Sequence, residues 1–187
     1  MPEGTSLLAR VAARAAAQLN EADEFVDRLA GHGGTALEHL RELYGDRDDF
    51  AAAVVDIFDV AIAAAGARDT VLYERDRIRE SDPRWYLRND LVGAWCYVER
   101  FAGTLPRLLD HLDYLDELSI TYLHLMPVFA RPEGRNDGGY AVSDYRMVHS
   151  PLGTMDDLAD VAAALHRRGM SLALDFVFNH TADDHPW

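Results

Sequence analysis

The sequence predicts an α/β protein in which a helical segment is followed by a parallel sheet, and two observations carry this prediction. Up to about Arg79, apolar residues recur three and four positions apart, which is the period of helices with one buried face. From Gly93 onward, apolar runs of strand length alternate with amphipathic helical stretches, which is typical of a parallel sheet covered by helices. We expect a helical domain over residues 1–88 and a second domain over residues 89–187.

The first domain is expected to contain five helices, because glycines and polar capping residues interrupt the apolar pattern. Asn20 is the expected cap of the second helix, and Gly31 its end, since glycine readily adopts the conformation that closes a helix. The expected helices cover about residues 6–19, 20–31, 35–45, 48–66 and 69–79.

The second domain is expected to contain three buried strands separated by helices. The strands are "GAWCYVERF", "TYLHLMPV" and "MSLALDFVFNH", and the helices are residues 105–120 and 154–169. Thr154 caps the later helix, with Asp157 at the third position in a variant of the capping box. Residues 129–153 are expected to form a long loop. On this pattern alone, a closed barrel and an open sheet are equally possible.

Composition limits the partners of the chain. The formal net charge is −14, so we expect neither nucleic acid nor an anionic membrane as a partner, because both repel such a surface. No stretch has the apolar length of a membrane span or of a secretion signal, so a cytoplasmic location is expected.

The single cysteine, Cys96, lies in an apolar-aromatic run and is expected to be a buried, inert thiol.

Polar residues at the end of the third expected strand are candidates for a functional site, since parallel α/β proteins carry their chemistry at the carboxyl ends of strands. Alternation places Asp175 on one face of this strand, with Phe176 and Phe178 on the other. A carboxylate in a buried strand needs partners, so Asp175 is expected to be a hydrogen-bonded site residue. Asn179 and His180 bind a sugar hydroxyl or cap loop backbone, and the residues alone leave both open.

The loop after the second strand contains "RNDGGYAVSDYR". Gly138 and Gly139 let the backbone bend sharply and present Asp137 and Tyr140 from a fixed turn. An aromatic ring beside a carboxylate is a usual way to hold a sugar, and plain packing of Tyr140 is the alternative.

A metal site is a further alternative at "NHTADDH". His180, Asp183, Asp184 and His185 are potential ligands there. Such loop acids and histidines are common and no other ligand cluster supports them, so no metal and no cofactor are expected.

Three segments resemble the α-amylase superfamily of glycoside hydrolases, and most closely amylosucrase. They are "YVERFAGTLPRLLDHLDYLDELSITYLHLMPVF", "PEGRNDGGYAVSDYR" and "GTMDDLADVAAALHRRGMSLALDFVFNHT". "DFVFNH" is similar to a stretch shared by the superfamily, whereas "HLMPVF", "PEG" and "DGGYAVS" resemble the amylosucrase branch. The resemblance implies a helical domain followed by the first three strands of a (β/α)8 TIM barrel, left incomplete at this length.

The resemblance also implies an activity and site residues. Amylosucrases split sucrose, release fructose and transfer the glucosyl unit to an α-1,4-glucan, so sucrose and α-glucan are the implied substrates. His180 would bind the glucosyl ring, Tyr140 would stack on it, and Asp137 would help close the pocket through an arginine from later in the family's chain. Asp175 and Asn179 would be structural supports of the site.

The catalytic carboxylates of the family follow later strands than the three expected here. A retaining glycosidase needs a nucleophile and an acid/base about 5 Å apart. We therefore expect no catalytic residue within this chain and an inactive fragment. The alternatives are a sucrose hydrolase, another α-glucoside-acting relative such as a trehalose synthase, and a non-catalytic sugar-binding module.

Overall fold

The computed structural model describes residues 3–19 and 24–186, and the chain divides into two compact units, residues 1–78 and 79–187. The boundary expected from the sequence, between residues 88 and 89, lies ten residues further along the chain. Arg79 belongs with the second unit because its guanidinium donates to Ser171 Oγ at 2.7 Å and lies 4.1 Å from the ring centroid of Trp85.

The first unit is helical, as the sequence predicts. It contains α1 (Glu3–Gln18), α2 (Glu24–Tyr44), α3 (Phe50–Gly66) and most of α4 (Thr70–Ser81). Its core includes Val11 and Ala15 of α1, Leu29 of α2 and Ile62 of α3. Among the described residues no single helix has the length and hydropathy to span a membrane, while α3 and α4 taken as a pair do by length and composition.

One helix replaces two of the expected five, so the prediction of a break at Gly31 is wrong. Helix α2 continues through Gly31, Gly33 and Gly34 to Tyr44. Packing explains why a glycine suits this helix, because a Cβ on Gly33 would lie 2.9 Å from side-chain atoms of both Leu8 and Leu29. Tertiary contact therefore outweighs the low helix propensity of glycine. The expected cap, Asn20, lies outside the described residues.

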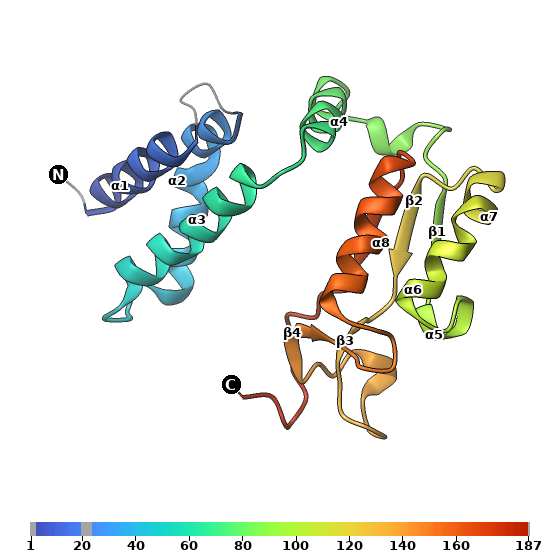
Figure 1. Ribbon diagram of the computed structural model, residues 1–187. Coiled ribbons are helices and arrows are strands. Elements are labelled where there is room, and N and C mark those ends of the chain that lie inside the picture. The colour runs from blue at the N-terminus through green and yellow to red at the C-terminus, as the bar shows by residue number, and fades with distance from the viewer. Residues whose placement is uncertain (1–2, 20–23, 187) are drawn as a thin grey trace. The chain divides into compact units, whose positions relative to one another are not determined.

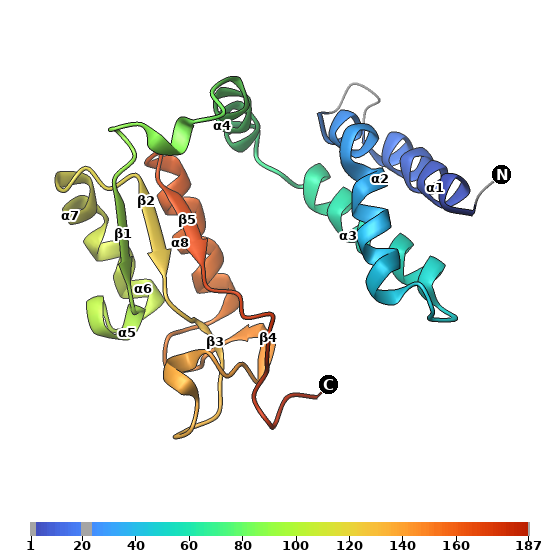
Figure 2. The same ribbon diagram turned by 180° about the vertical axis from the view of Figure 1, so that it is seen from behind.

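The second unit is a three-stranded parallel sheet with helices on one face. Strands β1 (Gly93–Cys96), β2 (Tyr122–Leu125) and β5 (Ser171–Leu174) lie in the order β1-β2-β5. Figures 1 and 2 show the helices on a single face of this sheet. These helices are α5 (Val98–Phe101), α6 (Leu105–Leu108), α7 (Leu112–Glu117) and α8 (Met155–Arg167), with the 3-10 turn η2 (Leu109–His111) between α6 and α7. A further 3-10 turn, η1 (Trp85–Leu87), precedes β1.

The core of this unit lies between the helices and the sheet. Alternate residues of β2 face it, with Leu123 and Leu125 buried and Tyr122 and His124 only partly covered. On β1, Trp95 is 72% exposed. The described part is thus the start of a barrel-like α/β domain with three parallel strands and no closure, as the sequence predicts.

All three expected strands are shorter than their apolar runs. Strand β1 ends at Cys96, and the following residues form the short helix α5, which buries Val98. Strand β5 ends at Leu174, just before the last backbone bond to β2, from Asp175 N to Leu125 O at 3.3 Å. Pro127 has no N–H to continue this ladder.

The loop expected at residues 129–153 contains a small antiparallel sheet. Strand β3 (Phe129–Ala130) pairs with β4 (Asp144–Val148), and a 3-10 turn, η3 (Asp137–Gly139), lies between them. The predicted capping box of α8 is confirmed, because Thr154 Oγ1 accepts from Asp157 N while Asp157 Oδ2 accepts from Thr154 N.

Candidate functional site

The candidate site forms where the carboxyl ends of the three parallel strands meet. Tyr97 follows β1, the loop with η3 follows β2, and Asp175 follows β5. Parallel strands end at the same edge of a sheet, so these segments converge there. Figure 1 shows β3, β4 and the chain that follows β5 gathered at this end.

Asp175 joins two of these segments through hydrogen bonds. Its Oδ2 accepts from the Tyr140 hydroxyl at 2.9 Å, and its Oδ1 lies 3.0 Å from His124 Nε2. Its side chain is 22% exposed, so these partners compensate for much of the water that the carboxylate loses. The sequence expectation that Asp175 is a hydrogen-bonded residue, not a surface acid, is confirmed.

Tyr140 is held as a neutral hydrogen-bond donor. Burial, and then the hydrogen bond to Asp175 and the charge of that residue, raise the pKa of Tyr140 to about 12. The phenol therefore keeps its proton throughout the physiological range. Because the hydroxyl is committed to Asp175, the ring of Tyr140 is restrained in orientation.

The turn that carries Tyr140 is closed by Asn136. The Asn136 side chain accepts from Gly139 N at 3.2 Å and donates to Pro132 O at 3.0 Å. Gly138 and Gly139 have φ of 67° and 99°, so glycine is required for the sharp bend that the sequence predicts. Asp137 has a φ of 51°, which aspartate tolerates, and it is exposed.

The side chains of Asn179 and His180 contact each other, and this pair is separate from the hydrogen bond between Tyr140 and Asp175. His180 Nδ1 lies 2.5 Å from Asn179 Oδ1, and both residues are exposed. An amide oxygen only accepts, so Nδ1 carries the proton and a neutral His180 has Nε2 free to accept. The geometry leaves His180 able to bind a hydroxyl group.

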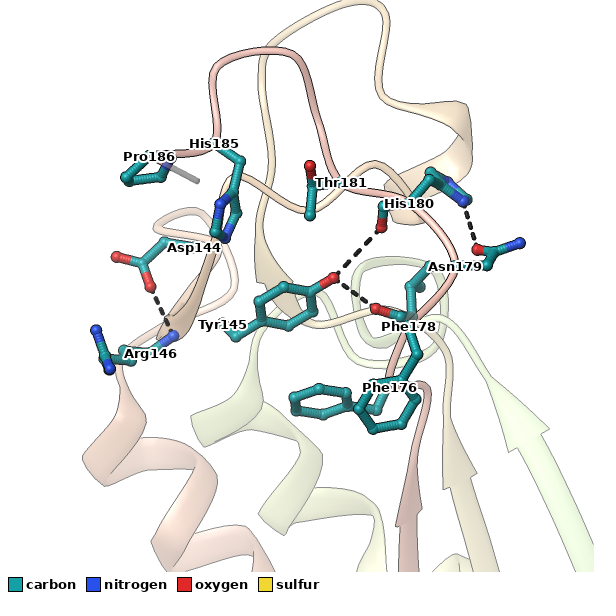
Figure 3. A pocket seen from close by; sticks show the side chains of 11 residues that line it. Asp144, Tyr145, Arg146, Phe176, Phe178, Asn179, His180, Thr181, His185 and Pro186 are labelled. Carbon is teal, nitrogen blue, oxygen red and sulfur yellow. Dashed lines mark hydrogen bonds between the residues drawn. The ribbon is translucent and has the colours of Figure 1, made fainter. Parts of the chain in front are cut away.

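Both residues line a cavity of about 440 Å³ with aromatic walls. The rings of Tyr145 and Phe176 stack at 4.8 Å, and Phe178 lies 4.7 Å from Phe176, between ring centroids. Figure 3 shows these rings together, with the Tyr145 hydroxyl bonded to the backbone oxygens of residues 177 and 180. Phe176 and Phe178 thus share a face, as the expected alternation requires, and Asp175 points elsewhere.

The structure joins four of the five predicted residues in two separate pairs, and Asp137 belongs to neither pair. Tyr140 and Asp175 bond directly, as do Asn179 and His180, but Tyr140, Asp175 and Asp137 do not line the aromatic cavity. Within residues 3–19 and 24–186 no hydrogen bond or ion pair of the Asp137 side chain is present, so its expected arginine partner stays a prediction.

Sequence reasoning missed His124 and Asn136. A signal for His124 was present, because a single polar residue interrupts the apolar strand "TYLHLMPV". Asn136 gave no signal that separates it from ordinary turn residues. Cys96 is half-buried, and burial raises the pKa of its thiol, in line with the inert role expected for it.

The metal alternative at "NHTADDH" is not supported by the geometry. In the part of the chain that the structure describes, no three His, Cys, Asp or Glu side chains are grouped to hold an ion. Asp184 Oδ1 instead accepts from Ser143 Oγ at 2.7 Å, and the His185 ring lies 5.6 Å from that of Tyr145.

Comparison with known proteins identifies a family and relatives that match part of the chain. Residues 64–187 match the family described as the catalytic domain of alpha amylase. The glucan 1,6-alpha-glucosidase of Streptococcus dysgalactiae subsp. equisimilis is 42% identical over 85 residues, which are 46% of this chain and 16% of that protein. The oligo-1,6-glucosidase of Parageobacillus thermoglucosidasius is 41% identical over 85 residues, 46% of this chain and 15% of that protein. The chain thus spans a small part of the curated relatives it matches.

Among solved structures, the trehalose-6-phosphate hydrolase of Bacillus licheniformis is 31% identical with a TM-score of 0.49, covering 55% of this chain and 19% of that one. A mutant of MutB in complex with sucrose is 36% identical with a TM-score of 0.48, covering 52% of this chain and 18% of that one.

Proposed function

The chain belongs to the alpha-amylase family, and from this premise we propose that it carries part of the sugar site of an enzyme that acts on α-glucosides. The observation that carries the proposal is the bond between the Tyr140 hydroxyl and Asp175 Oδ2, 2.9 Å long. It restrains an aromatic ring at the carboxyl edge of the sheet, where barrel enzymes bind their substrates.

Each predicted residue has a role in this proposal. The Tyr140 ring covers the apolar face of a glucosyl unit, and His180 Nε2 bonds one of its hydroxyls. Asp137 supplies a negative charge, either to a sugar hydroxyl or to an arginine. Asp175 orients Tyr140 and Asn179 orients His180, through the bonds of 2.9 and 2.5 Å.

Asp175 is a support and not the nucleophile. A retaining glycosidase attacks the anomeric carbon with a carboxylate oxygen that is free to form a bond. Both oxygens of Asp175 already have partners, at 3.0 and 2.9 Å. We assign the nucleophile and the acid/base to carboxylates other than Asp175, because the resemblance to the family places them after later strands than β5.

Sucrose is the glucoside that we propose, with transfer of the glucosyl unit to an α-glucan and release of fructose. The support is the resemblance of "HLMPVF", "PEG" and "DGGYAVS" to amylosucrases. A second candidate is hydrolysis of an α-1,6-glucoside, which is favoured by the names of the two curated relatives at 42% and 41% identity.

Titration calorimetry of the purified chain tests the sugar site. Sucrose and isomaltose are titrated into the wild type, Tyr140→Ala and Tyr114→Ala, a control at a half-exposed tyrosine of α7. We expect binding to the wild type and to the control, and none to Tyr140→Ala. A folded wild type that binds neither sugar contradicts the proposal.

The reaction itself is tested on the native product in its source cells. Its intact mass is measured, and the purified product is assayed for fructose released from sucrose and glucose released from isomaltose. Fructose release without free glucose supports transfer. Glucose release from isomaltose alone supports the α-1,6 candidate and contradicts the sucrose assignment.

A further inference from the structure

His124 is the one member of the Asp175 network to which the proposed function gives no role. It lies in the middle of β2, between Leu123 and Leu125, which are buried toward the helices. Its side chain therefore projects from the opposite face of the sheet, which the helices do not cover, and is 39% exposed. His124 does not line the aromatic cavity.

The neighbouring strand brings Asp175 to His124. Strands β2 and β5 pair in parallel, with His124 opposite Ala173, so the side chain two residues beyond Ala173 projects from the same face. Asp175 Oδ1 lies 3.0 Å from His124 Nε2. A carboxylate only accepts, so Nε2 carries the proton in both the neutral and the charged form of His124.

The same carboxylate has one remaining oxygen, and that oxygen holds Tyr140. The bond to Oδ2 is 2.9 Å, and the two bonds together fix the plane of the carboxylate. If His124 did not donate, Asp175 could rotate about its side-chain torsions and its Oδ2 would no longer face the Tyr140 hydroxyl. Tyr97 and Asp137 are further titratable groups that act electrostatically on Tyr140, and neither bonds Asp175.

We propose that His124 is a positioning residue of the sugar site, acting through Asp175 to fix the orientation of the Tyr140 ring. The inference rests on the proposed function for its effect on sugar binding. The coupling of His124 to Tyr140 does not depend on that function and can be measured without a sugar.

The coupling is measured on the purified chain by NMR, as the rate at which the Tyr140 hydroxyl proton exchanges with water. The signal is assigned by its loss in Tyr140→Phe. We expect His124→Phe, which keeps a ring but removes the donor, to speed exchange about tenfold, since a hydrogen bond to a charged group is lost. His124→Gln, which restores a neutral donor, should return the rate toward that of the wild type.

His111→Phe is the matched control, since the His111 ring packs edge-on against Phe101 and away from this network. It should leave the exchange rate unchanged. Circular dichroism establishes that each variant is folded, and His124→Ala, which also lacks a donor, replaces His124→Phe if the latter is not. An exchange rate that is the same in the folded donor-less variant and in the wild type overturns the proposal, because His124 then only links β2 to β5.

Sucrose and isomaltose affinities of the same variants test the consequence for the site. We expect affinity to fall about tenfold in His124→Phe, the factor for one such bond, and to recover in His124→Gln. A wild type that binds neither sugar contradicts the proposed function while the exchange rates still decide the coupling. Faster exchange with unchanged affinity overturns the positioning role alone.

Discussion

The guanidinium of Arg131 occupies the space that a Cβ on Gly139 would need. Arg131 is itself held in place, because its Nη2 donates to Glu99 Oε1 at 2.9 Å and its side chain is 10% exposed. Gly139 is buried beside it, with a φ of 99°. The residue before Tyr140 is therefore restrained by Arg131, which an ion pair with the exposed Glu99 of α5 holds in place.

Substitution of Gly139 should be costly for this reason. We expect Gly139→Ala to lower the free energy of unfolding by more than about 2 kcal/mol, since a left-handed residue with a Cβ costs roughly 1–2 kcal/mol before any clash. Gly134→Ala is the control, because Gly134 has a φ of 82° and no atom within 4 Å of a Cβ. Urea denaturation should show a clearly smaller loss for it, and equal losses would contradict the steric role of Arg131.

The stability of the chain should fall at alkaline pH because of Tyr140. Its pKa is about 12 in the folded chain and about 10 in the unfolded chain. Because the pKa is raised on folding, Tyr140 contributes stability that is fully present below pH 10. This contribution is lost as the pH rises through 12. Denaturation of the wild type and Tyr140→Phe should show the difference in free energy of unfolding shrinking across this window. The other tyrosines cancel in the comparison, and a constant difference would refute the assigned pKa.

The capping box of α8 should contribute measurably to stability. Thr154→Ala removes the acceptor of the Asp157 N–H, so we expect a loss of about 1 kcal/mol in thermal or urea denaturation. Thr154→Ser keeps the hydroxyl and should lose little. If the alanine and serine variants unfold alike, the side-chain hydroxyl does not cap the helix.

The sequence predicted those parts of the fold that are governed by local pattern. The parallel strands and the cap at Thr154 follow from apolar runs and a capping motif. The bond between Asp175 and Tyr140 was foreseen only as a need for some partner, because the pairing of residues 35 positions apart depends on strand register and on how a loop folds back. The contact between His124 and Asp175 also depends on strand register. It joins two neighbouring strands, and the alternation of apolar residues does not show which residues of those strands lie opposite each other.

Long-range packing also explains the error at Gly31. Glycine has a low helix propensity, and three glycines within four residues favour a break. The sequence does not show that α1 approaches α2 closely at Gly33, where Leu8 lies within 2.9 Å of the site of a Cβ. The buried contacts of Leu29 and Leu37, on either side, hold a single helix across the glycines.

Alanine substitutions within α2 distinguish a continuous helix from a break. Gly31 is exposed with no atom within 4 Å of a Cβ, so Gly31→Ala should raise the free energy of unfolding by about 0.5–1 kcal/mol. Gly33→Ala gains the same propensity but meets Leu8 and Leu29, so its net gain should be smaller or negative. Chemical denaturation of both variants and of the wild type measures these changes in the free energy of unfolding. If Gly31 instead ended a helix in a left-handed conformation, Gly31→Ala would be destabilising, and the description of α2 as one helix would be wrong.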